Sequence, residues 1–214
     1  MAEYLIWGAT GQAKVVREAL VESDYRLVTL VDNRQMPSPF PGVPVLSGLE
    51  GLQHWLRTRG NNNDLYGVVA IGGGKGRDRV QIISVLENLG LKILEVRHPT
   101  AFVADDAVVG AGCQLLAQSA VCTHTRLGTG VIVNTSASVD HDCKLADGVH
   151  IGPGAHLAGE VVVGANSFVG TGAIVLPRIA IGDGVTVGAG AVVTKDIPDG
   201  LVVSGNPARL HRSH

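Results

Sequence analysis

Two different hydrophobic patterns divide the 214-residue chain. Up to about residue 99, short apolar runs alternate with segments whose apolar residues recur at helical spacing. Strands and helices that alternate at these lengths predict βαβ units around a parallel sheet of about four strands. We expect strands over 3–8, 25–33, 64–74 and 91–96, and helices over 11–23, 48–60 and 76–90.

From residue 103 to residue 193 every sixth residue is aliphatic, without a gap, which indicates an internal repeat. The fifth position of each hexapeptide is usually small or aliphatic, and glycine, asparagine or aspartate often follows the regular aliphatic residue. One large and one small inward residue per hexapeptide suits short strands that meet at sharp corners. The sixteen regular positions are Val103, Val109, Leu115, Val121, Leu127, Val133, Val139, Leu145, Ile151, Leu157, Val163, Val169, Val175, Ile181, Val187 and Val193.

Composition and charge narrow the class of ligand. Glycine is frequent (29 residues), whereas the chain has two Trp, three Tyr and three Phe, so the core should consist of aliphatic side chains around tight turns. A net charge of −2 without a Lys/Arg cluster argues against nucleic acid and an anionic membrane as partners. No apolar stretch reaches the ~18 residues that a membrane span needs, and the first residues do not resemble a signal peptide. We therefore expect a cytoplasmic protein that binds small molecules.

The three cysteines fit neither a disulfide framework nor a zinc knuckle, because none of them forms a CxxC pair. Cys113 and Cys143 fall on the small inward position of the hexapeptide, so we expect both to be unreactive core residues.

The six-residue repeat resembles that of the hexapeptide-repeat acyltransferases. The resemblance implies a left-handed parallel β-helix of triangular section, with three hexapeptides per circuit and about five circuits. On this basis we expect an α/β, Rossmann-like nucleotide-sugar-binding domain over 1–99, an all-β left-handed β-helix over 100–197 and a capping tail over 198–214. Because the ends of such a coil expose strand edges, we expect the α/β domain to cover the first circuit and the tail to cover the last.

The stretch "SVDHDCKLADGVHIG" (138–152) places two histidines nine positions apart. With eighteen residues per circuit, His141 stacks with Thr123 and Gly159, while His150, half a circuit away, stacks with Ile132 and Phe168. Neither histidine occupies an inward position, so both should point outward, on different sides of the prism. Outward histidines are usually solvated and inert, which is our interpretation of His124, His156, His211 and His214.

His141 differs from the other histidines because Asp140 and Asp142 flank it. A neighbouring carboxylate orients an imidazole and raises its basicity, as a general base near neutral pH requires. Adjacent side chains on a strand face opposite ways. This pairing therefore needs a turn at 141–142 or a carboxylate from elsewhere in the chain.

The segment "NTSASVDHDCKLADGVHIGPGAHLAGEVVVG" (134–164) is similar to that of the NeuD/PglD-like sugar O- and N-acetyltransferases. The resemblance implies that His141 is the catalytic base, that Asp142 increases its basicity and that His150 contacts acetyl-CoA. It also implies that Gly159, Thr171 and Ala189 line the path of the cofactor, although tight coils demand small residues in any case. The implied assembly is a homotrimer with active sites between subunits, acetyl-CoA as co-substrate and no metal.

The loop "GATGQAK" (8–14) joins the first expected strand to the first helix and can present backbone N–H groups to a phosphate. It lacks the third glycine of the dinucleotide fingerprint, so the signal for NAD is weak. The resemblance implies instead a nucleotide-activated amino sugar, usually a UDP-sugar, although Gln12 replaces a frequent histidine and Gly73-Gly74 replaces Asp-Asn. A plain tight turn is the alternative interpretation. The substrate-binding positions that match are Thr10, Gly11, Gln12, Asp32, Asn33, Gly72 and Gly73.

We therefore expect an acetyl-CoA-dependent N-acetyltransferase that acts on a UDP-linked 4-amino-4,6-dideoxy sugar. A sialic acid or other sugar O-acetyltransferase is the close alternative, and a non-catalytic nucleotide-sugar-sensing or scaffold trimer is an alternative of another class. A γ-type carbonic anhydrase shares the prism, but it needs two of its three metal-binding histidines five residues apart. The histidines at 124, 141, 150 and 156 do not supply that pair.

Overall fold

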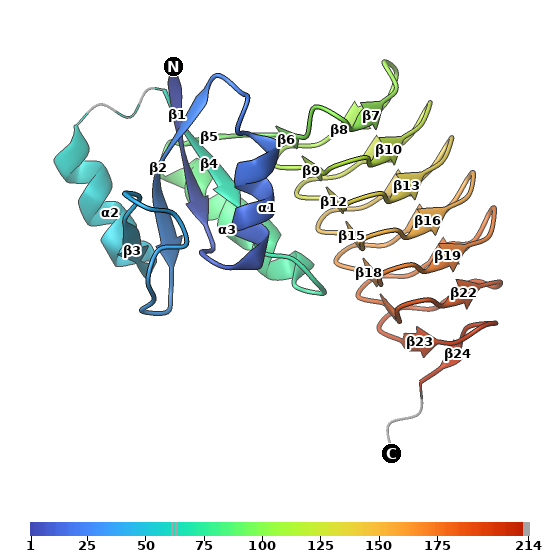
Figure 1. Cartoon of the computed structure of the whole chain (residues 1–214). Helices are drawn as coiled ribbons and strands as arrows, with labels where there is room; N and C mark the ends of the chain where they lie inside the picture. The colour runs from blue at the N-terminus through green and yellow to red at the C-terminus, as the bar shows by residue number, and fades with distance from the viewer. Residues whose placement is uncertain (61, 63, 212–214) are drawn as a thin grey trace.

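An α/β domain and a three-faced prism lie side by side (Figure 1) in the computed structural model, which describes residues 1–60, 62 and 64–211. The parallel sheet of the α/β domain has the strand order β3-β2-β1-β4-β5. Its elements are β1 (Ala2–Trp7), α1 (Gly11–Ala19), β2 (Tyr25–Asp32), β3 (Val45–Ser47), α2 (Gly48–Arg59), β4 (Leu65–Val69), α3 (Gly76–Asn88) and β5 (Lys92–Ile93).

The seven elements expected in this half are all present, in the expected order. The fifth strand, β3, was not expected, because three residues are too few to give a hydrophobic pattern of their own. It forms by pairing with the end of β2, where Leu30 to Asp32 lie opposite Val45 to Ser47.

Apart from its last two strands, the prism consists of two-residue strands that pair in parallel with the strands eighteen residues away. The first face contains β6 (Val96–Arg97), β9 (Gln114–Leu115), β12 (Ile132–Val133), β15 (His150–Ile151), β18 (Phe168–Val169), β21 (Thr186–Val187), β23 (Val202–Ser204) and the antiparallel β24 (Arg209–Leu210). The second face contains β7 (Phe102–Val103), β10 (Ala120–Val121), β13 (Ser138–Val139), β16 (His156–Leu157), β19 (Ile174–Val175) and β22 (Val192–Val193). The third face contains β8 (Val108–Val109), β11 (Arg126–Leu127), β14 (Lys144–Leu145), β17 (Val162–Val163) and β20 (Ala180–Ile181).

The core of the prism follows the six-residue period. Of the sixteen regular aliphatic positions, all are buried except Val103 and Val109 of the first circuit, which are partly buried. Cys113 and Cys143 are fully buried on the small inward position, as predicted. Burial raises the pKa of the Cys113 thiol to about 12 and that of Cys143 to about 11, which keeps both thiols protonated and inert.

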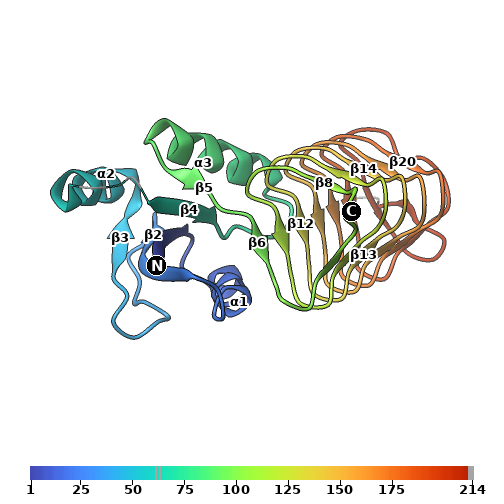
Figure 2. The ribbon, with the colours of Figure 1, turned by 90° about the horizontal axis from the view of Figure 1, so that it is seen from above.

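The α/β domain packs along the side of the prism instead of covering its first circuit, so our expectation on this point was wrong (Figures 1 and 2). The backbone passes from one sheet to the other within two residues: Leu94 N still bonds to the α/β sheet, and Val96 N already bonds to the prism. So short a connection places the domain beside the first face. The side chains of Phe102 and Val108 at the uncovered end are 60% and 50% exposed.

Arg79 on α3 connects the α/β domain to the prism through hydrogen bonds. Its guanidinium is fully buried and donates to the carbonyl oxygens of Gly130 (2.6 Å), Gly148 (2.6 Å) and Val149 (3.3 Å) at the corner between the third and first faces. It also donates to Ile71 O (2.7 Å), which follows β4. Burial lowers the pKa of Arg79 to about 10, so the group keeps its charge at neutral pH.

The C-terminal segment continues the first face. β23 pairs with β21, and Leu201 and Ala208 pack against the end of the prism core. Residues 212–214, the end of the expected capping tail, lie outside the described residues. Within the described part of the chain, no helix is both long and apolar enough to cross a membrane.

Candidate active site

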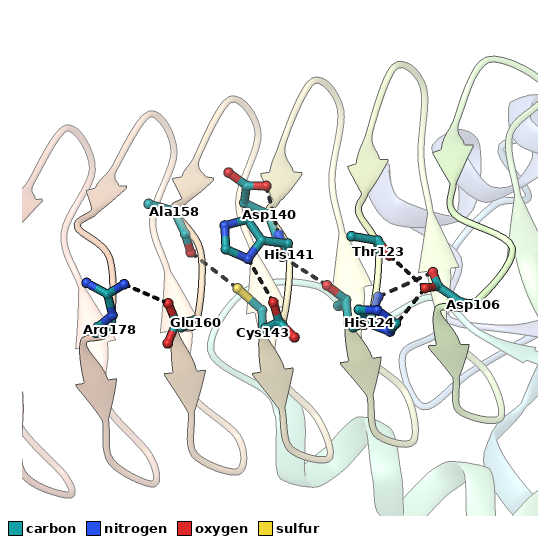
Figure 3. A network of polar contacts seen from close by, with 11 residues as sticks. Asp106, Thr123, His124, Asp140, His141, Cys143, Ala158, Glu160 and Arg178 are labelled. Atoms are coloured by element: carbon teal, nitrogen blue, oxygen red, sulfur yellow. Dashed lines mark hydrogen bonds and ion pairs between the residues drawn. The ribbon is translucent and has the colours of Figure 1, made fainter.

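His141 lies in the turn between β13 and β14, at the corner between the second and third faces (Figure 3). Asp142 adopts a left-handed backbone conformation (φ 59°), which brings its carboxylate back toward the preceding ring. His141 Nδ1 lies 2.9 Å from Asp142 Oδ2, and the His141 backbone N–H donates to Asp140 Oδ1 at 2.7 Å. The turn that the pairing requires is therefore present.

The carboxylates around His141 favour its protonated form. The hydrogen bond to Asp142 makes the largest contribution and raises the pKa of His141 above its ordinary value, and the negative charges of Asp140 and Glu160 act in the same direction. Because the Nδ1–H group donates a hydrogen bond to Asp142, Nε2 is the basic nitrogen of the ring. The His141 side chain is 48% exposed, so the ring is accessible to a ligand at this corner.

Gly159 occupies the same corner one circuit further along, directly against the His141 ring. A Cβ added to Gly159 would collide with His141 Nε2 and Cε1, and the Glu160 N–H donates to the His141 carbonyl at 2.9 Å. The predicted stacking of these two positions is confirmed. The absence of a side chain at Gly159 leaves the space that the imidazole occupies.

His150 points outward from the first face, as predicted, but the α/β domain covers it and leaves it 4% exposed. Its Nδ1 lies 3.3 Å from Gly73 O, and Nε2 lies 3.1 Å from Asn134 Nδ2. The Thr135 N–H donates to Asn134 Oδ1, which turns the Asn134 amino group toward His150. Burial, helped by the charge of Arg79, lowers the pKa of His150 to about 4, so the ring is neutral.

The register predicted for His150 is confirmed, since it pairs with Ile132 and Phe168 on neighbouring strands. Its ring centroid lies 5.1 Å from that of Phe168. Both ring nitrogens already have partners within the chain. A contact between His150 and acetyl-CoA therefore stays a prediction.

The other positions expected along the path of acetyl-CoA lie at two different corners. Gly159 is at the corner between the second and third faces, whereas Thr171 and Ala189 are exposed at the corner between the first and second faces. Thr171 and Ala189 stack one circuit apart, because the Gly190 N–H donates to the Thr171 carbonyl at 2.8 Å. One chain does not bring these three residues together.

A cavity of about 760 Å³ opens at the carboxyl ends of β1, β2 and β4, where parallel α/β sheets bind their ligands. Of the seven positions expected to bind substrate, five line it and two, Gly11 and Gly73, do not. Three further residues line the cavity that were not expected there: Lys75, Asp78 and Gln81. Their three-residue spacing at the start of α3 was the available signal. The expected residues in the lining are Thr10, Gln12, Asp32, Asn33 and Gly72.

Asp32 is already held by donors from its own chain. It accepts the Ala9 N–H at 3.1 Å and bonds with Arg34 through Nε at 3.0 Å and Nη2 at 3.1 Å. The hydrogen bond from the Arg34 side chain is the main reason that the pKa of Asp32 lies below its ordinary value. The charges of Arg34 and Lys75 are balanced by the two aspartates of the lining, Asp32 and Asp78. The N-termini of α1 and α3 add backbone N–H groups that suit a diphosphate.

The α/β domain, which contains the cavity, lies on one side of the prism, away from β13 and β14 (Figure 2). The α/β domain packs on the first face, whereas β13 and β14, which flank His141, belong to the second and third faces. A ligand in the cavity of one chain is therefore remote from His141 of that chain. Among the described residues, no three His, Cys, Asp or Glu side chains are placed to share a metal ion.

Comparisons with known proteins agree with this architecture over the whole chain. Residues 160–195 match the family described as bacterial transferase hexapeptide (six repeats). No curated protein matches the chain by sequence. Among solved structures, the acetyltransferase domain of PglB from Neisseria gonorrhoeae is 39% identical, over 99% of this chain and 100% of that chain, with a TM-score of 0.89.

Two further structures contain ligands. The same PglB domain in complex with acetyl coenzyme A is 39% identical, over 98% of this chain and 99% of that chain, with a TM-score of 0.87. A variant of perosamine N-acetyltransferase from Caulobacter crescentus, in complex with CoA and GDP-perosamine, is 34% identical, over 100% and 98%, with a TM-score of 0.90. The predicted fold class, an α/β domain followed by a left-handed parallel β-helix, is confirmed.

Proposed function

The chain belongs to the hexapeptide-repeat acetyltransferases of the PglD-like type, and we propose on this premise that it transfers the acetyl group of acetyl-CoA to the amino group of a nucleotide-linked sugar. The observation that carries the proposal is the His141–Asp142 pair, which leaves a basic Nε2 at an exposed corner. Relatives that match over the full chain are bound to acetyl coenzyme A, or to CoA with GDP-perosamine.

In this function His141 is the general base. Acetyl-CoA supplies an activated thioester. Nε2 removes a proton from the sugar amine as it attacks the thioester carbonyl, and the imidazolium returns that proton to the departing thiolate. Asp142 stabilises the imidazolium through Nδ1. Cys143 plays no part, because its thiol is buried and its pKa is raised.

The corners of the prism suit the long, thin arm of acetyl-CoA. Thr171 and Ala189 are exposed and small, so a ligand can approach the backbone at the corner between the first and second faces. Gly159 provides the same closeness beside His141. We assign these residues to cofactor binding, together with His150, which lies on the first face beneath the α/β domain.

The active site is proposed to lie between subunits of a homotrimer. Within one chain the α/β domain, which contains the nucleotide-sugar cavity, lies away from β13 and β14, which flank His141, and the small residues of the cofactor path are at two corners. A cyclic assembly, in which each subunit presents a different surface to its neighbour, would bring the His141 corner of one chain to the cavity side of the next.

The identity of the nucleotide on the sugar substrate is tested separately from the transfer reaction. We expected a UDP-sugar, and Lys75 with the backbone N–H groups at the starts of α1 and α3 suits the diphosphate of any such substrate. The perosamine relative binds a GDP-linked sugar, so UDP- and GDP-linked forms both belong in the test. A cytoplasmic location, where acetyl-CoA and nucleotide sugars are available, completes the proposal.

The test is the release of free thiol from acetyl-CoA in the presence of UDP- and GDP-linked 4-amino-4,6-dideoxy sugars. Sialic acid is included as an O-acetylation substrate. We expect turnover with at least one amino sugar, an acetylated product by mass spectrometry and loss of turnover in His141→Ala. His124→Ala, a change to another exposed corner histidine one circuit away, is the matched control and should remain active.

If sialic acid is acetylated and no amino sugar is, the protein is an O-acetyltransferase and not an N-acetyltransferase. Binding of nucleotide sugar without any thiol release would favour a non-catalytic sensor. Full activity of His141→Ala would contradict the role of this residue as the base.

A further inference from the structure

A buried glutamine of the prism contacts the wall of the nucleotide-sugar cavity. Gln114 lies on β9 of the first face and is fully buried beneath the α/β domain. Its Nε2 donates to Val69 O at 2.7 Å, at the end of β4. Its Oε1 accepts a hydrogen bond from Gln12 Nε2, also at 2.7 Å. Gln114 therefore links the sheet under the cavity to a residue that lines it.

These two bonds determine the orientation of both side-chain amides. A backbone carbonyl can only accept, so Gln114 must turn its amino group toward Val69 and its oxygen toward Gln12. Gln12 must in turn present its own amino group to that oxygen. The remaining polar atom of Gln12, Oε1, is therefore a hydrogen-bond acceptor whose direction the buried Gln114 has fixed.

The free acceptor of Gln12 lies at the part of the cavity nearest the prism. Its Oε1 would be 3.3 Å from a Cβ added to Gly72, and the same added atom would be 3.7 Å from Cε1 of His150. Gln12 and Gly72 both line the cavity. Among the described residues, none donates a hydrogen bond to Gln12 Oε1.

We propose that Gln114 is a positioning residue that orients Gln12 so that its Oε1 accepts a hydrogen bond from a hydroxyl or amino group of the bound sugar. The proposal rests on the proposed function. A phosphate oxygen is itself an acceptor and would be repelled at this point. A donor group of the ligand must therefore face Gln12, which we assign to the sugar, and the diphosphate is assigned to the part of the cavity near Lys75.

A double-mutant cycle tests this arrangement. We expect Gln12→Leu and Gln114→Leu each to raise KM for the nucleotide-linked amino sugar about tenfold, the effect of one hydrogen bond, with KM for acetyl-CoA unchanged. The sugar KM of the double variant should be no higher than that of the more strongly affected single variant, because Gln114 acts only through Gln12. Gln53→Leu on α2, the same change away from the cavity, is the control.

Several outcomes would overturn the proposal. They are an unchanged sugar KM in a folded Gln114→Leu variant, fully additive effects in the double variant, or an equal rise in both KM values. If Gln114→Leu does not fold, Gln114→Met replaces it, since methionine is closer to glutamine in shape but cannot accept the bond from Gln12, and it should raise only the sugar KM. A wild-type enzyme that acetylates no nucleotide-linked amino sugar would instead contradict the proposed function itself.

Discussion

The imidazole of His141 rests on Gly159, one circuit further along the same corner, so that the position of the ring depends on a missing Cβ. Gly159→Ala should push the ring away and lower kcat/KM by about 100-fold, because small displacements of a catalytic group are costly. The ring is exposed and can move, so the melting temperature should change little. Steady-state kinetics and thermal unfolding check this, with Gly51→Ala on α2, which meets only ordinary contacts, as control.

Asp142 should control the pH dependence of the reaction. His141 acts as a base only when deprotonated, and its pKa is raised chiefly by the hydrogen bond to Asp142. Asp142→Asn should therefore move the acidic limb of the kcat/KM profile to lower pH and reduce the plateau about tenfold or more. A limb that stays in place while the plateau falls would show that Asp142 does not set the basicity of His141.

His150 should make the protein sensitive to acid. Its pKa in the folded chain is about 4, against 6.5 for the free side chain, so the unfolded chain takes up the proton first as the pH falls. The free energy of unfolding should decline between about pH 6.5 and pH 4, by about 3 kcal/mol from this group. Urea unfolding should show a smaller decline in His150→Gln. An equal decline would contradict this account, and His54→Gln, an exposed histidine on α2, should behave as wild type.

Arg79 should be essential for the joint between the two domains. Arg79→Met keeps much of the buried volume but leaves the carbonyls of two prism residues, Gly130 and Gly148, and of Ile71 without this donor. We expect a loss of at least about 3 kcal/mol in the free energy of unfolding. Arg77→Met, an exposed arginine on the same helix, should cost about 0.5 kcal/mol or less. Equal effects would show that the buried hydrogen bonds contribute little.

The six-residue period was sufficient to predict the inside of the prism and the corners. It placed Val139 and Leu145 in the core, which the structure confirms, and His141 at an outward position. A turn at 141–142 was one of two ways to pair His141 with a carboxylate, and it is the one that the structure shows. The six-residue period also predicted that His141 stacks with Gly159. These relationships are local or follow from the eighteen-residue circuit, so a regular repeat contains them.

What covers each face could not be predicted in the same way. Gln114 and His150 occupy outward positions two circuits apart on the first face, and both are buried only because the α/β domain packs there. That packing depends on the two-residue connection after β5 and on the buried Arg79, neither of which has a periodic signature. The available signal for Gln114 was its polar side chain at an outward position that stacks with His150 two circuits further along.

The central claim is that His141 and the nucleotide-sugar cavity of one active site come from different subunits. Subunit complementation tests it most directly, using differently tagged His141→Ala and Arg34→Glu/Lys75→Glu chains, each inactive alone. Mixed trimers purified through both tags contain one intact site of three, so we predict about a third of wild-type activity. Mixed trimers that form but remain inactive would place the whole site within one chain and contradict the account.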